Sequence, residues 1–424
     1  GVGLYSGGNP NVWLSNSYSN DGITNIDAYR ADINILNAVK SGDGQAIFDP
    51  LQAMVDQVTT NNPALGSEPS TNAVDPNFEM PSEWKYNIGA TYETENEYIF
   101  SADVLYSQKQ DSATIVDLSS FDTGNDTIDG RPIYAKQVLG VVGTRNVTRN
   151  SLYSDLLLTN APADGSSTTI SVAAKKEYDF GLDAQIGYAY NKSKDYNPMT
   201  SSVAFSNFTN ISVSDQNDPG VGTSNYEVPH NFTLSLRYTM ELVGGYDTSF
   251  SLFANRKAGR NFSYTFDNFQ PGTDLADYRS LMYVPTLEQY GNDVVFASAA
   301  VEEAFDQFIA DAGLEKYRGQ IVPRNSGESS WYTRVDFKVD QELPGFTEGH
   351  SANAFFVIKN LGNMLNSDWG VQRRGPFNSA AVVDATMNAD GSYRINSVSP
   401  QNAAESVFQV GSLWEVVMGV KYRF

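Results

Sequence analysis

Residues 408–424 read FQVGSLWEVVMGVKYRF and end the chain. From Val410 onward almost every even-numbered residue is apolar or aromatic, whereas Glu415, Lys421 and Arg423 stand at odd positions. Successive side chains of a strand point to opposite faces, so this pattern predicts one apolar face and one charged face. A strand of about 9–11 residues with aromatic residues at its ends is typical of a membrane-spanning barrel. An ordinary edge or sandwich strand is the alternative for this stretch taken alone.

The same alternation recurs throughout the chain. The clearest segments lie at 84–92, 98–106, 182–190, 232–240 and 335–339, and weaker ones lie at 168–178, 248–256 and 352–361. In the last of these, residues 355–358 are apolar at consecutive positions and do not show which face points to lipid. With an initial strand before residue 15, the pattern predicts about ten strands.

The connections between these segments alternate in length. Short ones lie near 94–96, 179–181, 242–246 and 344–350, whereas long ones fill about 15–79, 119–165, 197–226, 263–329 and 363–408. Outer-membrane barrels have short periplasmic turns and long extracellular loops. The sequence therefore predicts an all-β fold, a transmembrane antiparallel β-barrel in contact with the lipid of the bacterial outer membrane.

Composition narrows the functional classes. The 424 residues include 28 basic and 50 acidic side chains, a net charge of 28 − 50 = −22, which would repel the phosphates of a nucleic acid. The absence of cysteine excludes thiol and disulfide chemistry. The sequence contains no run of about 18 apolar residues, the length that would predict a membrane helix. Its 24 Tyr and 23 Phe suit the aromatic girdles of barrel strands.

Two of the long connections are predicted to contain short helices. Asp49 and Pro50 form an N-cap and first-turn pair before the apolar positions of 51–58. Residues 301–317 place their apolar side chains on one helical face, although Gly313 weakens the second half. Both helices are expected to pack over the mouth of the barrel.

The chain has no recognisable catalytic constellation, and we do not expect an enzyme. The two histidines, His230 and His350, are expected at opposite ends of the barrel, and neither a G-x-S-x-G elbow nor a phosphate-binding loop is found. One loop has clustered oxygen ligands that could hold calcium, the one cofactor considered, with a solvated turn as the alternative. These residues are Asp122, Asn125, Asp126 and Asp129.

Short phrases spread along the chain resemble one family of outer-membrane proteins. They lie at 11–16, 75–78, 81–84, 228–233, 244–246, 283–285, 318–321, 324–325, 360–366 and 368–370. In this order, and together with the last strand, they resemble the C-terminal part of a TonB-dependent outer-membrane receptor of the Oar-like subgroup. The resemblance implies that residues 1–424 are the C-terminal part of a barrel of about 22 strands that is closed by a plug domain.

Several parts of such a receptor lie outside this sequence. The chain starts at Gly1 as if already inside a strand, and we expect it to be a mature product or a fragment of a longer protein. The resemblance implies ligand transport energised by the TonB system through the absent plug. It also implies contact of the C-terminal signal with the barrel-assembly machinery, here through Gly419, Tyr422 and Phe424.

The charged faces of two strands are expected to point into the barrel. An Arg or Lys that faced lipid at the midplane would cost about 2–4 kcal/mol. In a plugged receptor these side chains would contact the plug, and in a porin they would line water. They are Arg334, Asp336, Lys338, Asp340, Glu415, Lys421 and Arg423.

Aromatic residues of the long loops are candidates for contact with a transported ligand, by stacking on a sugar or clamping a peptide. Packing of the loops against one another is the alternative. The candidates are Trp13, Tyr18, Tyr29, Tyr283, Tyr290, Trp369 and Phe377.

The predicted function is TonB-dependent transport of an unidentified ligand, with this chain forming barrel wall and extracellular loops. A passive porin or a structural barrel would share the strand pattern and remains an alternative. A soluble β-sandwich adhesin is disfavoured, because it gives no reason for the alternation of short and long connections.

Overall fold

Ten long strands, joined in chain order, dominate the structure. The computed structural model describes residues 1–7, 13, 40–42, 71–136, 138–142, 145–148, 155–272, 276–377 and 379–424. The strands are β1 (Val2–Ser6), β3 (Ser82–Glu93), β4 (Ile99–Gln110), β11 (Ser166–Tyr178), β12 (Leu182–Asp195), β14 (His230–Val243), β15 (Tyr246–Lys257), β21 (Tyr332–Pro344), β22 (Ser351–Lys359) and β27 (Glu415–Arg423).

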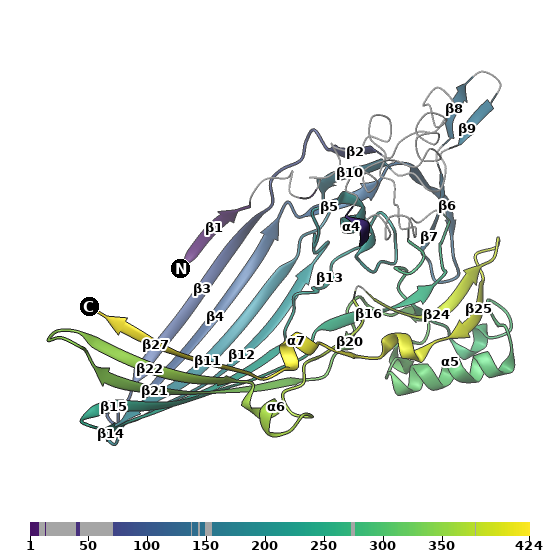
Figure 1. The fold of residues 1–424 in the computed structure, drawn as a ribbon. Coiled ribbons are helices and arrows are strands. Elements are labelled where there is room, and N and C mark those ends of the chain that lie inside the picture. The colour runs from purple at the N-terminus through teal and green to yellow at the C-terminus, as the bar shows by residue number, and fades with distance from the viewer. Residues whose placement is uncertain are drawn as a thin grey trace.

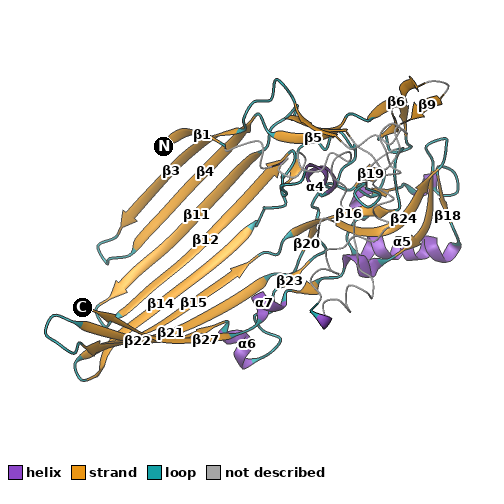
Figure 2. Ribbon diagram, turned by 45° about the horizontal axis from the view of Figure 1, so that its top comes forward, coloured by secondary structure: helices purple, strands orange, loops and turns teal. Residues whose placement is uncertain are grey.

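These strands form a single antiparallel sheet in which each one pairs with the next, and the short β13 (Gly222–Thr223) extends β12. Figures 1 and 2 show the tilted strands side by side in a curved wall. The strands β1 and β27 are the two edges of the sheet, which does not close on itself in the described residues. The predicted all-β class, the antiparallel order and the number of strands are confirmed.

The register of the wall sorts the side chains by face. Ile88 pairs with Val104, and Val104 pairs with Ile170. Toward the other edge, Ile358 of β22 pairs with Val416 of β27. The alternating patterns of the separate strands therefore merge into one continuous apolar face.

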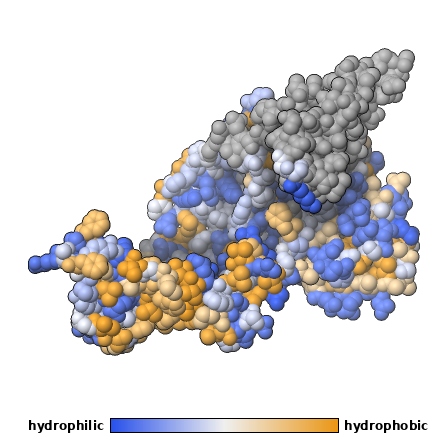
Figure 3. Space-filling view, in the orientation of Figure 1, coloured by the Kyte–Doolittle hydropathy of each residue, from blue (hydrophilic) through white to orange (hydrophobic). Residues whose placement is uncertain are grey.

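The same register resolves residues 355–358, which the sequence left open. Phe356 pairs with Met418 and lies on the apolar face, whereas Phe355 pairs with Gly419 and lies on the opposite face. Figure 3 shows hydrophobic residues gathered over the stretch where β21, β22 and β27 approach the long connections.

In the described part of the chain, most of the apolar face has no protein layer over it. Ile88 is 74% exposed and Met418 is 72% exposed, whereas a sandwich would bury such side chains between two sheets. The β-sandwich alternative is therefore wrong. An antiparallel wall with an uncovered apolar face and a charged face is the wall of an outer-membrane β-barrel, which uses lipid as the solvent of its outer surface.

Helices contribute to the loops. Within the described ranges, no helix is long and apolar enough to cross a membrane.

The last strand begins later than its sequence pattern predicts. Residues Gln409–Ser412 form the short helix α7, and β27 starts only at Glu415. The buried hydroxyl of Ser412 donates to the carbonyl of Phe408 at 2.8 Å and accepts from the backbone N–H of Gln372 at 2.9 Å. These local bonds offer the backbone an alternative to the sheet ladder.

The long connections on one side of the wall fold into a body of their own, which we call the loop domain. Its five-stranded sheet has the order β18-β25-β24-β16-β20, with the helix α5 beside it. The bounds are β16 (Asn261–Asp267), β18 (Val294–Phe296), α5 (Ala299–Asp311), β20 (Gly327–Glu328), β24 (Ser379–Met387) and β25 (Tyr393–Val398). The sequence did not predict this sheet, because two of its pairings are parallel and join distant segments.

The helix α5 confirms one of the two predicted loop helices. Ser298 is its N-cap, and its hydroxyl accepts from the backbone N–H of Val301 at 3.3 Å. The helix ends at Asp311, and Gly313 follows with a φ of 65°, a conformation that glycine adopts at little cost. The other predicted helix, at 49–58, lies outside the described residues.

Smaller elements complete the extracellular side. A second sheet, in the order β2-β10-β5, packs with the helix α4 around Leu156, Leu158 and Phe208. The remaining bounds are β2 (Thr71–Val74), β5 (Ala113–Asp117), β6 (Ser120–Asp126), β7 (Pro132–Lys136), β8 (Val138–Val142), β9 (Arg145–Thr148), β10 (Asp155–Asn160), α4 (Ala204–Thr209), β17 (Tyr283–Val284), β19 (Gln320–Ile321), α6 (Leu361–Leu365), β23 (Arg373–Arg374) and β26 (Ser406–Val407).

Candidate functional site

The charged face of the wall brings the predicted inward residues together. The register aligns Lys338 with Val357 and Val417, and Asp340 with Phe355 and Gly419. All seven predicted residues of β21 and β27 therefore lie on the face opposite the apolar band. Because the chain alternates along each strand, this face is the one that a closed barrel would turn toward its lumen.

Most of these charges are balanced along their own sheet. Arg334 donates to Asp336 at 2.8 Å, and Lys338 forms an ion pair with Asp340. Glu415 pairs with Lys359 of the adjacent strand at 3.0 Å. These pairs are solvent-accessible, so they keep the wall hydrated and add little stability.

A cavity of about 870 Å³ lies on this charged face, at the end of the wall where the short turns are. Lys338, Asp340, Lys421 and Arg423 line its wall, and Glu348 of the turn after β21 also borders it. Both signs of charge are therefore presented side by side, a surface suited to water or to a polar protein partner.

The three residues of the predicted C-terminal assembly signal have distinct surroundings. The ring of Phe355 lies directly over Gly419, so that a Cβ atom added there would approach the ring to 2.7 Å. Tyr422 lies beside the turn at 345–350, where its hydroxyl accepts from the backbone N–H of Phe346 at 3.0 Å and lies 2.9 Å from Nδ1 of His350. Phe424 follows the strand and is 97% exposed.

A second cavity, of about 340 Å³, lies at the opposite end of the wall, where β1, β3, β4 and β12 meet the loops. We call it the mouth cavity. Its walls include Tyr5, Trp13, Tyr196 and Met199, together with the half-buried Lys109. Aromatic and apolar walls with a few polar groups are typical of small-molecule sites.

Polar atoms at the mouth cavity lack partners. Lys109 forms no ion pair among the described residues, although Glu83 also lines the cavity and pairs with Lys85 at 3.2 Å. The hydroxyl of Ser112 and one carboxylate oxygen of Asp195 are buried without a hydrogen-bond partner in the described part of the chain. Such groups are usually satisfied in folded proteins, so their occurrence together favours a site that accepts a polar ligand.

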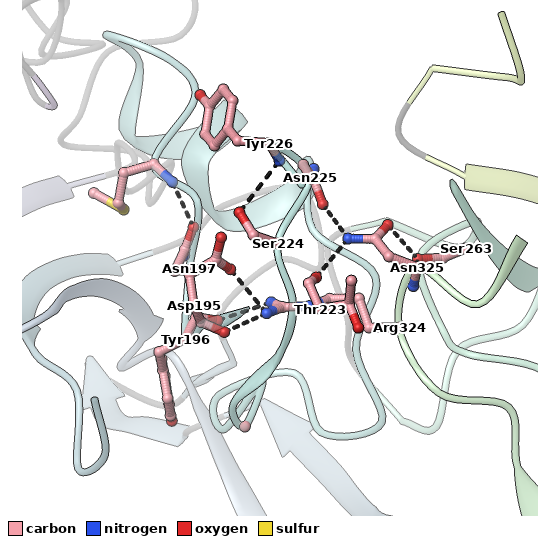
Figure 4. Close-up of polar contacts among 12 residues, drawn as sticks. Asp195, Tyr196, Asn197, Thr223, Ser224, Asn225, Tyr226, Ser263, Arg324 and Asn325 are labelled. Carbon is pink, nitrogen blue, oxygen red and sulfur yellow. Dashed lines mark hydrogen bonds and ion pairs between the residues drawn. The ribbon is translucent and has the colours of Figure 1, made fainter. Parts of the chain in front are cut away.

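Arg324, which precedes β20 of the loop domain, bonds to Asp195 and Tyr196 in the lining of the mouth cavity (Figure 4). Arg324 donates to the carboxylate of Asp195 at 2.8 Å and to the carbonyl of Tyr196 at 2.9 Å. Burial lowers the pKa of Arg324, and the charge of Asp195 offsets this only in part. The buried pair thus holds the residues that line the cavity in one position relative to β20.

The next residue extends this junction. The side-chain amide of Asn325 donates to the carbonyl of Thr223 at 2.7 Å and to the side chain of Asn225 at 2.6 Å. Its backbone N–H donates to the hydroxyl of Ser263 at 2.9 Å. Two long connections are therefore tied together above the wall, the one between β12 and β14 and the one between β15 and β21.

The structure separates the predicted ligand-contacting aromatics. Trp13 lines the mouth cavity, and its contact with a ligand stays a prediction. Tyr283 was a wrong choice, because it is 4% exposed in the loop-domain core. Tyr290 is half-buried, and its hydroxyl donates to Asp306 at 2.8 Å and accepts from Arg318 at 3.2 Å.

Trp369 and Phe377 lie away from the mouth cavity. Trp369 borders a groove with the outward-facing side chains of β21, on the apolar side of the wall, and its contact with a ligand stays a prediction. Phe377 is exposed in the connection between β23 and β24. Tyr18 and Tyr29 lie outside the described residues.

The expected calcium ligands do not converge. Asp129 turns into the loop domain and accepts from Arg131 at 2.6 Å, and both side chains are fully buried. Asp122 instead accepts from the backbone N–H of Gly124 at 2.8 Å. Within the described ranges, no three acidic or histidine side chains are placed to hold a metal ion together.

The sequence did not single out Asp195, Ser112, Lys109 or Arg324. A possible signal was the charged residue at the end of an alternating strand, which Asp195 is, but strand ends commonly carry such residues. The pairing of Asp195 with Arg324 joins positions 129 residues apart, so it depends on the fold of the loops.

Comparisons with known proteins add little detail. No family model and no curated protein matches this chain. Among solved structures, the outer membrane transporter YddB from Escherichia coli is similar, with a TM-score of 0.40 and 12% sequence identity. The match covers 84% of this chain and 35% of that protein, so the chain spans much less than two thirds of its length. The fold assignment above therefore depends on the sheet itself, and the Oar-like subgroup stays a prediction.

Proposed function

We propose that this chain forms the ligand-facing wall and extracellular loops of a TonB-dependent outer-membrane transporter of the Oar-like subgroup. The observation that carries the proposal is the two-faced wall. Its apolar face is uncovered and its charged face leads to an aromatic-lined cavity beneath folded loops. Such a wall can cross lipid while presenting a polar path on its other side.

The proposal includes further strands. Among the described residues no strand pairs with the outer edges of β1 and β27, and a sheet edge in lipid would leave several hydrogen bonds unmade. Together with the family resemblance, this supports the proposal that residues 1–424 are the C-terminal part of a larger barrel of about 22 strands. In it, the charged faces of β21 and β27 would contact a plug that couples to the TonB system.

The mouth cavity is the proposed place of first ligand contact. Trp13 and Tyr5 supply aromatic surface, and Lys109 supplies a positive charge. The hydroxyl of Ser112 and one carboxylate oxygen of Asp195 have no hydrogen-bond partner among the described residues. The Arg324–Asp195 pair keeps this arrangement in place. A ligand with an apolar face and several polar groups would fit these walls.

Transport is tested in cells that produce or lack the full-length protein. The solutes removed from a complex medium are compared by mass spectrometry, with and without a protonophore that collapses the inner-membrane gradient. We expect at least one solute whose removal requires the protein and stops with the protonophore. Removal that persists with the protonophore would instead indicate a passive porin, and no difference between the strains would indicate a structural barrel.

The place of ligand contact is tested by a matched pair of variants. Trp13→Ala should raise the concentration for half-maximal uptake by about tenfold, the loss of about 1.4 kcal/mol of binding. Trp369→Ala removes an indole on the apolar side of the wall and should leave that concentration unchanged. Equal effects of the two substitutions would contradict ligand capture at the mouth cavity.

A further inference from the structure

The apolar side of the wall carries a cluster of rings and one cation at its extracellular end, which we call the outer-rim cluster. It consists of Tyr188, His230, Phe232, Arg256 and Trp331. The His230 and Trp331 rings are stacked, with centroids 5.7 Å apart and planes 13° apart. The hydroxyl of Tyr188 lies 2.9 Å from Nδ1 of His230. The register pairs Tyr188 with Phe232 and Phe232 with Arg256, which places these residues on the lipid-facing side.

The depth of the cluster follows from the strands that carry it. The strand β14 begins at His230, and β15 ends at Lys257. The short turn that joins these two strands lies at their other end. Short turns mark the periplasmic side, so the outer-rim cluster lies at the level of the outer leaflet headgroups, where aromatic girdles gather.

Arg256 is a cation that has no counter-ion among the described residues. Its guanidinium carbon is 5.4 Å from the centroid of the Trp331 ring, and its guanidinium donates to the hydroxyl of Thr333 at 3.3 Å. Among the described residues it forms no ion pair, although the chain carries a net charge of −22. A charged side chain on the lipid-facing surface of a barrel is tolerated near the interface, where an anionic headgroup can compensate it.

A groove of about 330 Å³ is lined by Trp331 and Thr333, the two residues that the Arg256 guanidinium contacts. Trp331, Thr333 and Val335 of the lipid-facing side form one wall of the groove, and residues around α6 form the other. Trp369 and Leu365 of that segment are 58% and 68% exposed, although both are hydrophobic. Asp368 also lines the groove and is the acidic group that an anion would meet there.

We infer that this groove binds a phosphate-bearing lipid of net negative charge from the outer leaflet, with the phosphate on Arg256 and an acyl chain between Trp331, Val335 and Trp369. The planar guanidinium can donate two parallel hydrogen bonds to phosphate oxygens. The groove opens on the side of the wall that faces lipid, so a lipid reaches it without leaving the bilayer. Bound lipid would hold the segment around α6 against β21 and so anchor this part of the rim. The inference is independent of the transport function.

Native mass spectrometry of the full-length protein in detergent tests the inference. The protein is mixed with diphosphoryl lipid A, with phosphatidylcholine as a lipid of no net charge, and with inorganic phosphate as the free anion. We expect one lipid A molecule to be retained, no comparable retention of phosphatidylcholine, and no displacement of lipid A by inorganic phosphate. Equal retention of the two lipids, or displacement by phosphate, would overturn the inference.

Three substitutions locate the bound molecule. Arg256→Gln should lower the retained fraction of lipid A by about fivefold or more, since it removes a charge-assisted contact. Lys257→Gln is the matched control, because Lys257 is the next residue of the same strand and lies on the other face, and it should change nothing. Asp368→Asn should raise retention, since it removes the repelling carboxylate. A wild-type level of retention in Arg256→Gln, in protein whose thermal unfolding is unchanged, would contradict the assignment.

Discussion

The wall and the loop domain use hydrophobic residues in opposite ways. Ile88 and Met418 of the wall are 74% and 72% exposed, whereas Phe305 and Val294 of the loop domain are 0% exposed. The wall is a ladder of consecutive strands, and the described residues form no core on its apolar side. The loop domain has an ordinary core assembled from distant segments. The two regions therefore suit different solvents. Lipid covers the apolar side chains of the wall, whereas a protein core covers those of the loop domain.

The comparison also separates how the two regions hold charges. Wall charges pair near water, as in the 3.0 Å contact of Lys359 with Glu415. The loop domain buries the pair of Asp129 and Arg131 completely, and the same arginine donates to the carbonyl of Leu281 at 2.8 Å. Loss of a partner should thus matter far more in the loop domain than along the wall.

Breaking the buried pair is expected to have the largest effect. Arg131→Leu leaves the Asp129 carboxylate buried and unpaired, which should destabilise the loop domain by about 3–5 kcal/mol. Hydrogen exchange followed by mass spectrometry should show faster exchange in α5 and β25 and unchanged exchange in β3 and β4. Lys175→Met breaks an exposed pair and serves as the control. Unchanged exchange in α5 would contradict the role given to the pair.

A charge on the apolar face of the wall should have the next largest effect. Ile88→Arg is expected to destabilise the membrane-inserted protein by about 2–4 kcal/mol. Reversible unfolding by urea in lipid vesicles measures this cost. The matched substitution is Asn87→Arg, at the preceding residue of the same strand. Its side chain points to the other face of the wall, so this substitution should cost much less. Equal costs at positions 87 and 88 would sink the assignment of faces.

The contact of Phe355 with Gly419 predicts a smaller effect. Gly419→Ala places a Cβ atom 2.7 Å from the Phe355 ring and should destabilise the wall by about 1–3 kcal/mol through overpacking. The double variant with Phe355→Ala should recover part of that loss in the same urea assay. If the double variant is simply additive, the ring and the glycine do not interact as described.

Acid is expected to loosen the loop domain before the wall. Burial disfavours the charged form of Asp129, but the charge and hydrogen bonds of Arg131 outweigh burial and lower the pKa below its ordinary value of 3.8. A carboxyl whose folded-state pKa is lowered stabilises the fold above its unfolded pKa and loses that contribution as pH falls through the folded value.

Protease sensitivity of α5 should therefore rise only below about pH 4, and the rise should be shallower in Asp129→Asn than in the wild type. An equal acid response in both proteins would assign the loosening to other groups.

Local periodicity predicted the wall well. The alternation of 84–92 and 182–190 became β3 and β12, and the short connections became the turns at the periplasmic end. A period of two specifies the face of every side chain once a strand exists. The consecutive apolar residues 355–358 were the exception, and only pairing with β27 assigned Phe356 to the apolar face.

The loop domain and the candidate site were largely hidden from sequence reasoning. The helix α5 was predicted because its stripe and Gly313 are local signals. The parallel pairing of β16 with β24 joins Ser263 to Ser379, and no local pattern specifies such a distant partner. For the same reason Tyr283 and Trp369 were indistinguishable as loop aromatics, although one is buried in a core and the other borders the lipid-facing side.

The central claim is that even-numbered positions of β27 face lipid and odd-numbered ones face the barrel interior. The chain contains no cysteine, so single-cysteine variants at 416–420 can each carry one nitroxide spin label in vesicles. Electron paramagnetic resonance then measures collision with oxygen, which enriches in lipid, and with a water-soluble nickel complex. We predict oxygen contact at 416, 418 and 420 and lower oxygen contact at 417 and 419. The same accessibility at all five positions would contradict the account.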